Sequence, residues 1–301
     1  MNESTPYLIF VSLFALSTAA LFRPLAATFS LAVGNDEFTH ILLILPISAM
    51  LIVSEWGWLK SKMSPSPRTG TVLMIVGAIV ALVALKGLAG FAPDAQLSLS
   101  LLALVTLWSG AFVLCFGTLV AKYSLFPLGL LLWMVPIPSF ALARIVHWLQ
   151  AGSALSASAL FSAAGVPVSR EGFVLAIPGL SIEVARECSS IRSSLMLLVT
   201  TMVLAQLLLR QPWLKALVAL LAVPLSVAKN GLRIFVISML GTRVNRDFLT
   251  GWLHQQGGII FFLIALAAIL LVIWLLRSRE QTVAGETKLY TARIESFSTT
   301  G

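Results

Sequence analysis

The sequence predicts an all-α polytopic membrane protein, and composition is the first of three observations behind that prediction. Of the 301 residues, 58% are hydrophobic and only 11% are charged, and the mean hydropathy is +0.97. Soluble globular domains carry about 25% charged residues, so the chain falls outside that class. The second observation is a set of long apolar runs, and the third is the concentration of basic residues in loops on one side of them.

About eight apolar runs are long enough to cross a bilayer as helices. A hydrocarbon core about 30 Å thick needs about 20 apolar residues, and lipid cannot satisfy free backbone groups. No basic region precedes the first run, and Arg23-Pro24 stands where a cleavage site would lie. We therefore expect a first transmembrane helix there rather than a signal peptide. The predicted spans are 7–22, 39–57, 71–90, 99–121, 125–147, 190–209, 213–241 and 256–276.

Basic residues indicate the orientation of these spans. Cytoplasmic loops are enriched in Lys and Arg, and one side of the predicted bundle holds most of them, although Arg23 and Lys86 oppose the rule. Both termini are therefore expected in the cytoplasm, with an integral membrane domain over 1–279 and a polar, disordered cytoplasmic tail over 280–301. The residues on that side are Lys60, Lys62, Arg68, Lys122, Arg210, Lys215, Arg277 and Arg279.

The net charge of +8 is explained by anchoring to anionic lipid. No basic cluster is interleaved with aromatic residues, so we expect no nucleic-acid partner. The long outer segment 148–189 contains residues 166–184, where β-branched and polar residues alternate between Gly and Pro. That pattern predicts a small outer β-hairpin between spans five and six.

Three polar residues lie at the mouths of different predicted spans. Cys188 precedes span six, Arg233 lies 20 residues beyond the start of span seven, and His254 precedes span eight. At about 1.5 Å rise per residue Arg233 reaches the outer membrane surface, so the three groups share one membrane level. Ionisable side chains at such positions are costly, which makes them functional candidates.

A thiol, an imidazole and a guanidinium suit acyl transfer at an amide. An imidazole can take the thiol proton, and a cation can stabilise charge on the carbonyl oxygen. We predict Cys188 as nucleophile, His254 as base and later acid, and Arg233 as the oxyanion or substrate-orienting group. Structural explanations remain open for each: a packed thiol, an arginine that reaches the headgroups, and an interfacial histidine.

Three further residues, His40, Arg192 and Asn230, are candidates for substrate binding. Anchoring at the interface is the alternative for His40 and Arg192. The second cysteine, Cys115, lies inside an apolar run and is expected to behave as a small hydrophobic residue. No cofactor or metal is expected, because the chain has no short ligand spacing such as CxxC or HxxxH.

These motifs resemble the exosortase/archaeosortase family of membrane-embedded cysteine transpeptidase-like proteases, from about residue 36 to 265. The likeness is strongest in the Cys-Ser-Ser-Ile-Arg-Ser-Ser run at Cys188–Ser194, then in Asn230-Gly-Leu-Arg233-Ile, and then in His254 ahead of Gly258. That ordered set is the family's proposed catalytic triad, so the resemblance implies these roles for Cys188, Arg233 and His254. Many members have Gly and Ala where this chain has Ser190 and Glu187.

The resemblance implies a sorting enzyme of the cell inner membrane with its active site on the outer side. Its substrates would be membrane-anchored exported proteins with a PEP-CTERM-like signal: a short motif such as Pro-Glu-Pro, one transmembrane helix and a basic cluster. Cys188 would form a thioester, resolved by water or by another nucleophile. Two alternatives stay open: a transporter or polysaccharide-export subunit with a polar pathway through Arg233 and His254, and a structural membrane scaffold.

Overall fold

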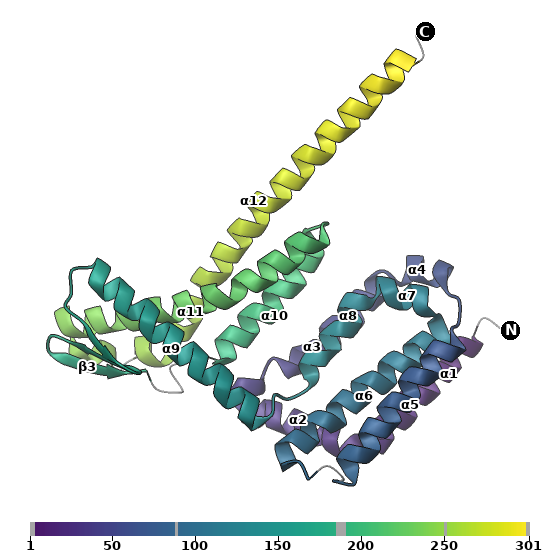
Figure 1. The fold of residues 1–301 in the computed structure, drawn as a ribbon, viewed down its shortest axis with the longest axis horizontal. Helices are drawn as coiled ribbons and strands as arrows, with labels where there is room; N and C mark the ends of the chain where they lie inside the picture. The colour runs from purple at the N-terminus through teal and green to yellow at the C-terminus, as the bar shows by residue number, and fades with distance from the viewer. Residues whose placement is uncertain (1–3, 88–89, 185–190, 250–251, 299–301) are drawn as a thin grey trace. The chain divides into compact units, whose positions relative to one another are not determined.

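The computed structural model describes residues 4–87, 90–184, 191–249 and 252–298, without the side chains of 252–256 and 281–298. The chain divides into two compact units, Met1–Arg144 and Ile145–Gly301 (Figure 1). Six helices are long and apolar enough to cross a membrane, or up to eight spans if two bent helix pairs each count as one. The prediction of an all-α polytopic membrane protein is therefore confirmed.

Among its described residues, the secondary-structure elements of the first unit are all helices. Helix α9 (Ser139–Ala163) begins in this unit and continues into the second. The remaining elements are α1 (Thr5–Ala20), α2 (Phe22–Gly34), η1 (Asp36–Phe38), α3 (Ile41–Ser54), α4 (Trp56–Leu59), η2 (Lys60–Lys62), α5 (Pro67–Leu85), α6 (Pro93–Phe116), α7 (Thr118–Tyr123), α8 (Leu125–Leu130) and η3 (Leu131–Met134).

Two sharp bends interrupt the helices of this unit. Predicted span one (7–22) corresponds to α1, and α2, which was not predicted, follows it at an angle of 74°. Predicted span five corresponds to Leu125–Met134 and the start of α9, which meet at 98°. Proline accounts for both bends, because its ring lacks an N–H and clashes with the carbonyl four residues earlier. Pro24 lies four residues after the end of α1, and Pro136 and Pro138 separate η3 from α9.

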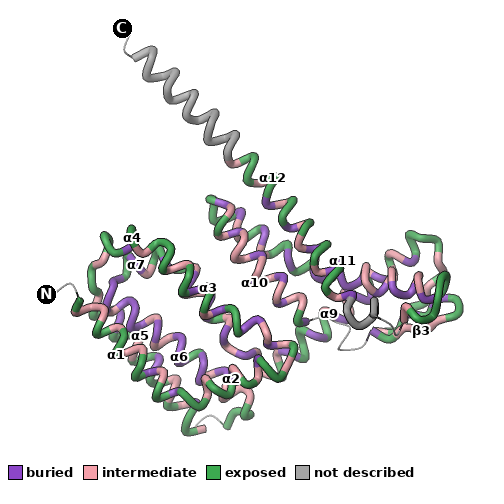
Figure 2. Tube along the Cα trace, turned by 180° about the vertical axis from the view of Figure 1, so that it is seen from behind, coloured by how far each residue is buried: buried purple, intermediate pink, exposed green. Residues whose placement is uncertain are grey.

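Helices α5 and α6 pack closely because glycines line their contact. A Cβ atom on Gly77 or Gly110 would lie within 3.0 Å of the facing helix, and Gly70 faces Leu114 in the same way. Small residues allow this approach, which is a common basis of helix packing in lipid. The opposite side of α5 is exposed (Figure 2), as expected for a lipid-facing stripe; it presents Val72, Ile75, Val76, Ile79 and Leu82.

The second unit combines helices with one small sheet. Helix α12 packs by a single stripe in which every fourth residue is buried, while its other faces present large apolar side chains. This is the pattern of a membrane helix packed on one side. The elements are the rest of α9, β1 (Ser169–Glu171), β2 (Val174–Ile177), β3 (Leu180–Glu183), α10 (Ile191–Leu208), α11 (Pro212–Arg243), η5 (Arg246–Leu249) and α12 (Trp252–Ser298).

The predicted β-hairpin is present and is extended to three strands. The sheet is antiparallel in the order β1-β2-β3, with Glu171 opposite Val174 and Ile177 opposite Leu180. Each turn contains two residues, and a glycine with positive φ makes each possible: Gly172 at 60° and Gly179 at 81°. The strands are thus consecutive in sequence and in space.

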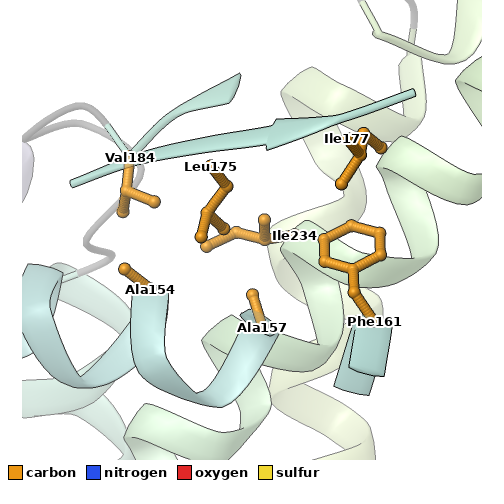
Figure 3. Close-up of a cluster of buried hydrophobic side chains, with 7 residues drawn as sticks. All are labelled: Ala154, Ala157, Phe161, Leu175, Ile177, Val184 and Ile234. Atoms are coloured by element: carbon orange, nitrogen blue, oxygen red, sulfur yellow. The ribbon is translucent and has the colours of Figure 1, made fainter. Parts of the chain in front are cut away.

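One face of this sheet packs on two helices of the same unit. Leu175 and Ile177 of β2 lie over Ala157 and Phe161 of α9, and Ile234 of α11 lies between them (Figure 3). All are buried hydrophobic residues. The cluster therefore holds the sheet against α11 at the turn that carries Arg233.

The predicted boundary at 279 and the disorder of the 280–301 tail stay predictions. Side chains beyond Glu280 lie outside the described residues.

Candidate active site

Arg233 lies on α11 directly beside the sheet. Its side chain is half-buried, and it lines a cavity of about 210 Å³. The opposite wall consists of β3 and the residue that follows it, Val184; Ile234, Ile237 and Ser238 of α11 and Leu249 of η5 complete the lining. Arg233 therefore borders a cavity between α11 and β3.

Val184, the residue that follows β3, is held by hydrogen bonds to both its main-chain N–H and its carbonyl. The N–H of Val184 donates to the carbonyl of Phe173 at 2.9 Å, and its carbonyl accepts from Nε2 of Gln150 at 2.9 Å. Both Val184 and Gln150 are buried. The chain therefore leaves the sheet, toward residues 185–190, from a defined point beside the Arg233 cavity.

Helices α9 and α11 cross closely at the residues that come just before Arg233 in the sequence. Nδ2 of Asn230 donates to Oγ of Ser153 at 2.9 Å, and Asn230 is only 1% exposed. A Cβ atom on Gly231 would clash with the side chain of Ser156, so only glycine allows the approach. Because Asn230 and Gly231 lie three and two residues before Arg233 on the same helix, this crossing fixes the position of the turn that carries Arg233.

A second set of polar contacts joins α10 to α11. Nζ of Lys229 donates to Oγ of Ser193, and Oγ of Ser226 bonds to Oγ of Ser194. Lys229 is 5% exposed and lies one helical turn before Arg233, so the two cations share a helix face. Burying a cation in an apolar helix costs free energy, so this contact is a candidate for a functional role.

The two helices are tied at their other ends as well. Nζ of Lys215, in the first turn of α11, donates to Oε1 of Gln206 in the last turn of α10 at 2.9 Å. The α10–α11 pair thus has one lysine bond at each end. Only the Lys229 bond is next to Arg233.

Comparison with known proteins identifies the family. The model of the transmembrane exosortase family (Exosortase_EpsH) matches residues 28–271, which is most of the chain. The chain belongs to the transmembrane exosortase family. No curated protein and no solved structure gives a significant match. The resemblance predicted from the sequence motifs is therefore confirmed at the level of the family.

Of the three predicted catalytic residues of this exosortase, the structure describes one side chain. Arg233 lines the cavity beside β3. Cys188 lies in 185–190, outside the described residues, and His254 lies in α12 with its side chain outside the described set. The proximity of the three groups stays a prediction.

The predicted substrate-binding residues have different surroundings. Asn230 is buried and bonded to Ser153, whereas Arg192 is exposed in the first turn of α10. His40 lies in the first unit, where it is 3% exposed and immediately precedes α3. Its Nδ1 has no hydrogen-bond partner among the described residues. A substrate role for each stays a prediction.

The structure adds residues to the site that the sequence analysis did not select. Lys229 was identifiable in principle, because it is a cation inside a predicted span. No charge in an apolar run marked Gln150, Ser153, Ser193 or Ser226, and uncharged polar residues are common in membrane helices. Among the described residues, no group of three His, Cys, Asp or Glu side chains gathers as metal ligands. Cys115 is a free, buried thiol in α6, as expected for a packing residue.

Proposed function

We propose that this exosortase-family protein is a cysteine peptidase or transpeptidase that cleaves C-terminal sorting signals of membrane-anchored exported proteins. The observation that supports this most directly is the Arg233 cavity beside β3. Val184, on its wall, is four residues from Cys188, and four residues span at most about 14 Å. This chain length limits how far the predicted nucleophile can lie from Val184, which supports the proposed pairing of Cys188 with Arg233.

The proposed reaction has two balanced steps. The thiol proton of Cys188 passes to His254, and the sulfur bonds to the carbonyl carbon of the scissile peptide while Arg233 stabilises the oxygen. The C–N bond then breaks, and His254 returns the proton to the leaving amine, which leaves a thioester. Water or an acceptor amine attacks that thioester and restores the thiol. No cofactor is needed.

The proposed location follows from the loop charges. With the basic loops in the cytoplasm of a cell inner membrane, both termini are cytoplasmic and Cys188, Arg233 and His254 face the outer side. A substrate anchored by its own transmembrane helix would then present its motif at that level. Anchoring would raise the local concentration of the scissile bond, as tethering does in general.

Reconstitution tests the proposal. The protein is placed in phosphatidylethanolamine–phosphatidylglycerol vesicles with a precursor that ends in a Pro-Glu-Pro-type motif, a transmembrane helix and a basic cluster. We expect cleavage near the motif, loss of cleavage after iodoacetamide, and a covalent protein–precursor complex that hydroxylamine releases. A precursor without the motif is the control. Cleavage that survives iodoacetamide, with no covalent complex, would contradict the thiol mechanism.

The two lysine bonds between α10 and α11 allow a sharper prediction. We expect Lys229→Met to lower the cleavage rate about 10-fold or more. The reason is that the hydrogen bond that holds the start of α10 to the part of α11 next to Arg233 would be lost. Displacements near 1 Å can change rates by up to about 100-fold. The measurement is the single-turnover cleavage rate in the same vesicles, with the thermal unfolding midpoint measured alongside.

Lys215→Met is the matched control, since it breaks the bond at the far end of the same helix pair. It should lower the thermal midpoint to a similar extent and leave the cleavage rate near that of the wild type. The double variant Lys229→Met/Ser193→Ala should be no slower than Lys229→Met, because partners in one bond are not additive. Equal rate losses for both lysine variants would refute a local role for Lys229.

A further inference from the structure

We infer that the outer edge of β3 binds an extended polypeptide segment as a fourth strand of the sheet. This inference rests on the proposed function and names how the substrate is held: by main-chain pairing beside Arg233. Four observations support it.

The first observation is that the sheet ends at β3. The strand order is β1-β2-β3, and among the described residues β3 pairs with β2 alone. An edge strand presents a row of main-chain donors and acceptors that can pair with another chain. Binding of a peptide to such an edge is a recurrent mode of recognition.

The second observation is the direction of the main-chain groups. In an antiparallel ladder, successive residues point their N–H and C=O groups alternately toward the partner strand and away from it. The N–H of Val184 donates to Phe173, on the β2 side. Leu180 and Ile182 therefore also face β2, and the main-chain groups of Ser181 and Glu183 face the outer edge.

The third observation is the course of the cavity along this edge. Alternate side chains of a strand point to opposite faces. All five residues from Leu180 to Val184 nevertheless line the one cavity of about 210 Å³. A cavity that is lined by consecutive residues, whose side chains alternate between the two faces, runs along the edge of the strand rather than over one face.

The fourth observation is the composition of the far wall. Ile234, Ile237 and Leu249 give it an apolar surface, and Arg233 and Ser238 add a cation and a hydroxyl. A peptide paired with β3 would place alternate side chains against this apolar wall. Its carbonyl groups would lie between the outward N–H groups of β3 and the Arg233 guanidinium. Cys188, the predicted nucleophile, follows Val184 by only four residues in the sequence.

Proline substitution tests the inference, because proline lacks the N–H that the outer edge would donate. Ser181→Pro removes an outward donor and spares the β2–β3 ladder, and proline is tolerated on that side of an edge strand. The probe is a fluorescent peptide comprising the motif, transmembrane helix and basic cluster, in phosphatidylethanolamine–phosphatidylglycerol vesicles. Binding is measured by anisotropy with the full-length protein in a Cys188→Ala background. We expect the apparent Kd to rise about tenfold, the effect of one lost hydrogen bond.

Arg170→Pro is the matched control. By the same alternation Leu175 directs its main-chain groups toward β3, so its partner on β1, Arg170, directs its N–H away from β2. Arg170 therefore lies at the opposite edge of the sheet and outside the cavity lining. We expect this variant to bind the peptide as the parent does. This control separates main-chain pairing at the β3 edge from general damage to the sheet.

Every outcome decides the inference. Equal binding by the parent and Ser181→Pro, equal weakening by both proline variants, or no binding by the parent would each overturn it. Dimers cross-linked through residue 181 without peptide would assign the edge to a second copy and overturn it too. Cleavage by the protein with Cys188 intact is scored separately. If the protein cleaves the precursor but Ser181→Pro binds the peptide normally, the proposed function stands and the binding edge does not. If Ser181→Pro selectively weakens peptide binding but the protein cleaves no precursor, the binding edge stands and the proposed function does not.

Discussion

Cys188→Ala should abolish cleavage of the precursor, with a loss of about 10⁴-fold or more in single-turnover rate. The reason is chemical, since alanine offers no sulfur to form the thioester. Cells that express the variant should accumulate full-length precursor in the membrane. The measurement is the precursor-to-product ratio on immunoblots, together with the rate in vesicles.

Cys115→Ala is the matched control for this prediction. Cys115 is the chain's other cysteine and is 2% exposed within α6. Its replacement should lower stability by about 1 kcal/mol through lost packing and leave cleavage intact. Processed precursor in the Cys188→Ala strain would refute the thiol mechanism and favour the transporter or scaffold alternatives, which tolerate loss of this sulfur.

Arg233→Ala should lower the cleavage rate about 10² to 10³-fold, the usual effect of removing one donor to a developing oxyanion. The cavity position of Arg233 is the structural basis, because this residue lines a cavity whose opposite wall is β3. Arg233→Lys keeps the charge and loses the planar fork, so it should recover only part of the rate. The measurement is kcat separated from KM in vesicles.

Arg243→Ala controls for removing a cation from the same helix. Arg243 is exposed in the last turn of α11 and lies outside the cavity lining. We expect its rate to stay near that of the wild type. If Arg233→Ala changed only KM, Arg233 would orient the substrate rather than stabilise the transition state. A rate within threefold of the wild type would remove Arg233 from the reaction.

The positions of the helices followed largely from local composition. Runs of about 20 apolar residues are recognisable because the bilayer demands them, and each predicted span corresponds to a helix or a bent pair of helices. The bends at α1–α2 and before α9 were not predicted. Pro24, Pro136 and Pro138 were visible in the sequence, but a proline does not reveal whether a helix kinks, breaks or ends.

The membrane class, the strands between spans five and six, and the family could all be predicted before any coordinates, because hydropathy, alternation and ordered motifs are local patterns. The three-dimensional fold was needed to show that Arg233 shares a cavity with β3, that Lys229 bonds Ser193, and that Asn230 is buried against Ser153. The physical reason is that these contacts join segments 30 or more residues apart. Which helix faces meet depends on packing volumes such as the missing side chain of Gly231, and no local pattern encodes that choice.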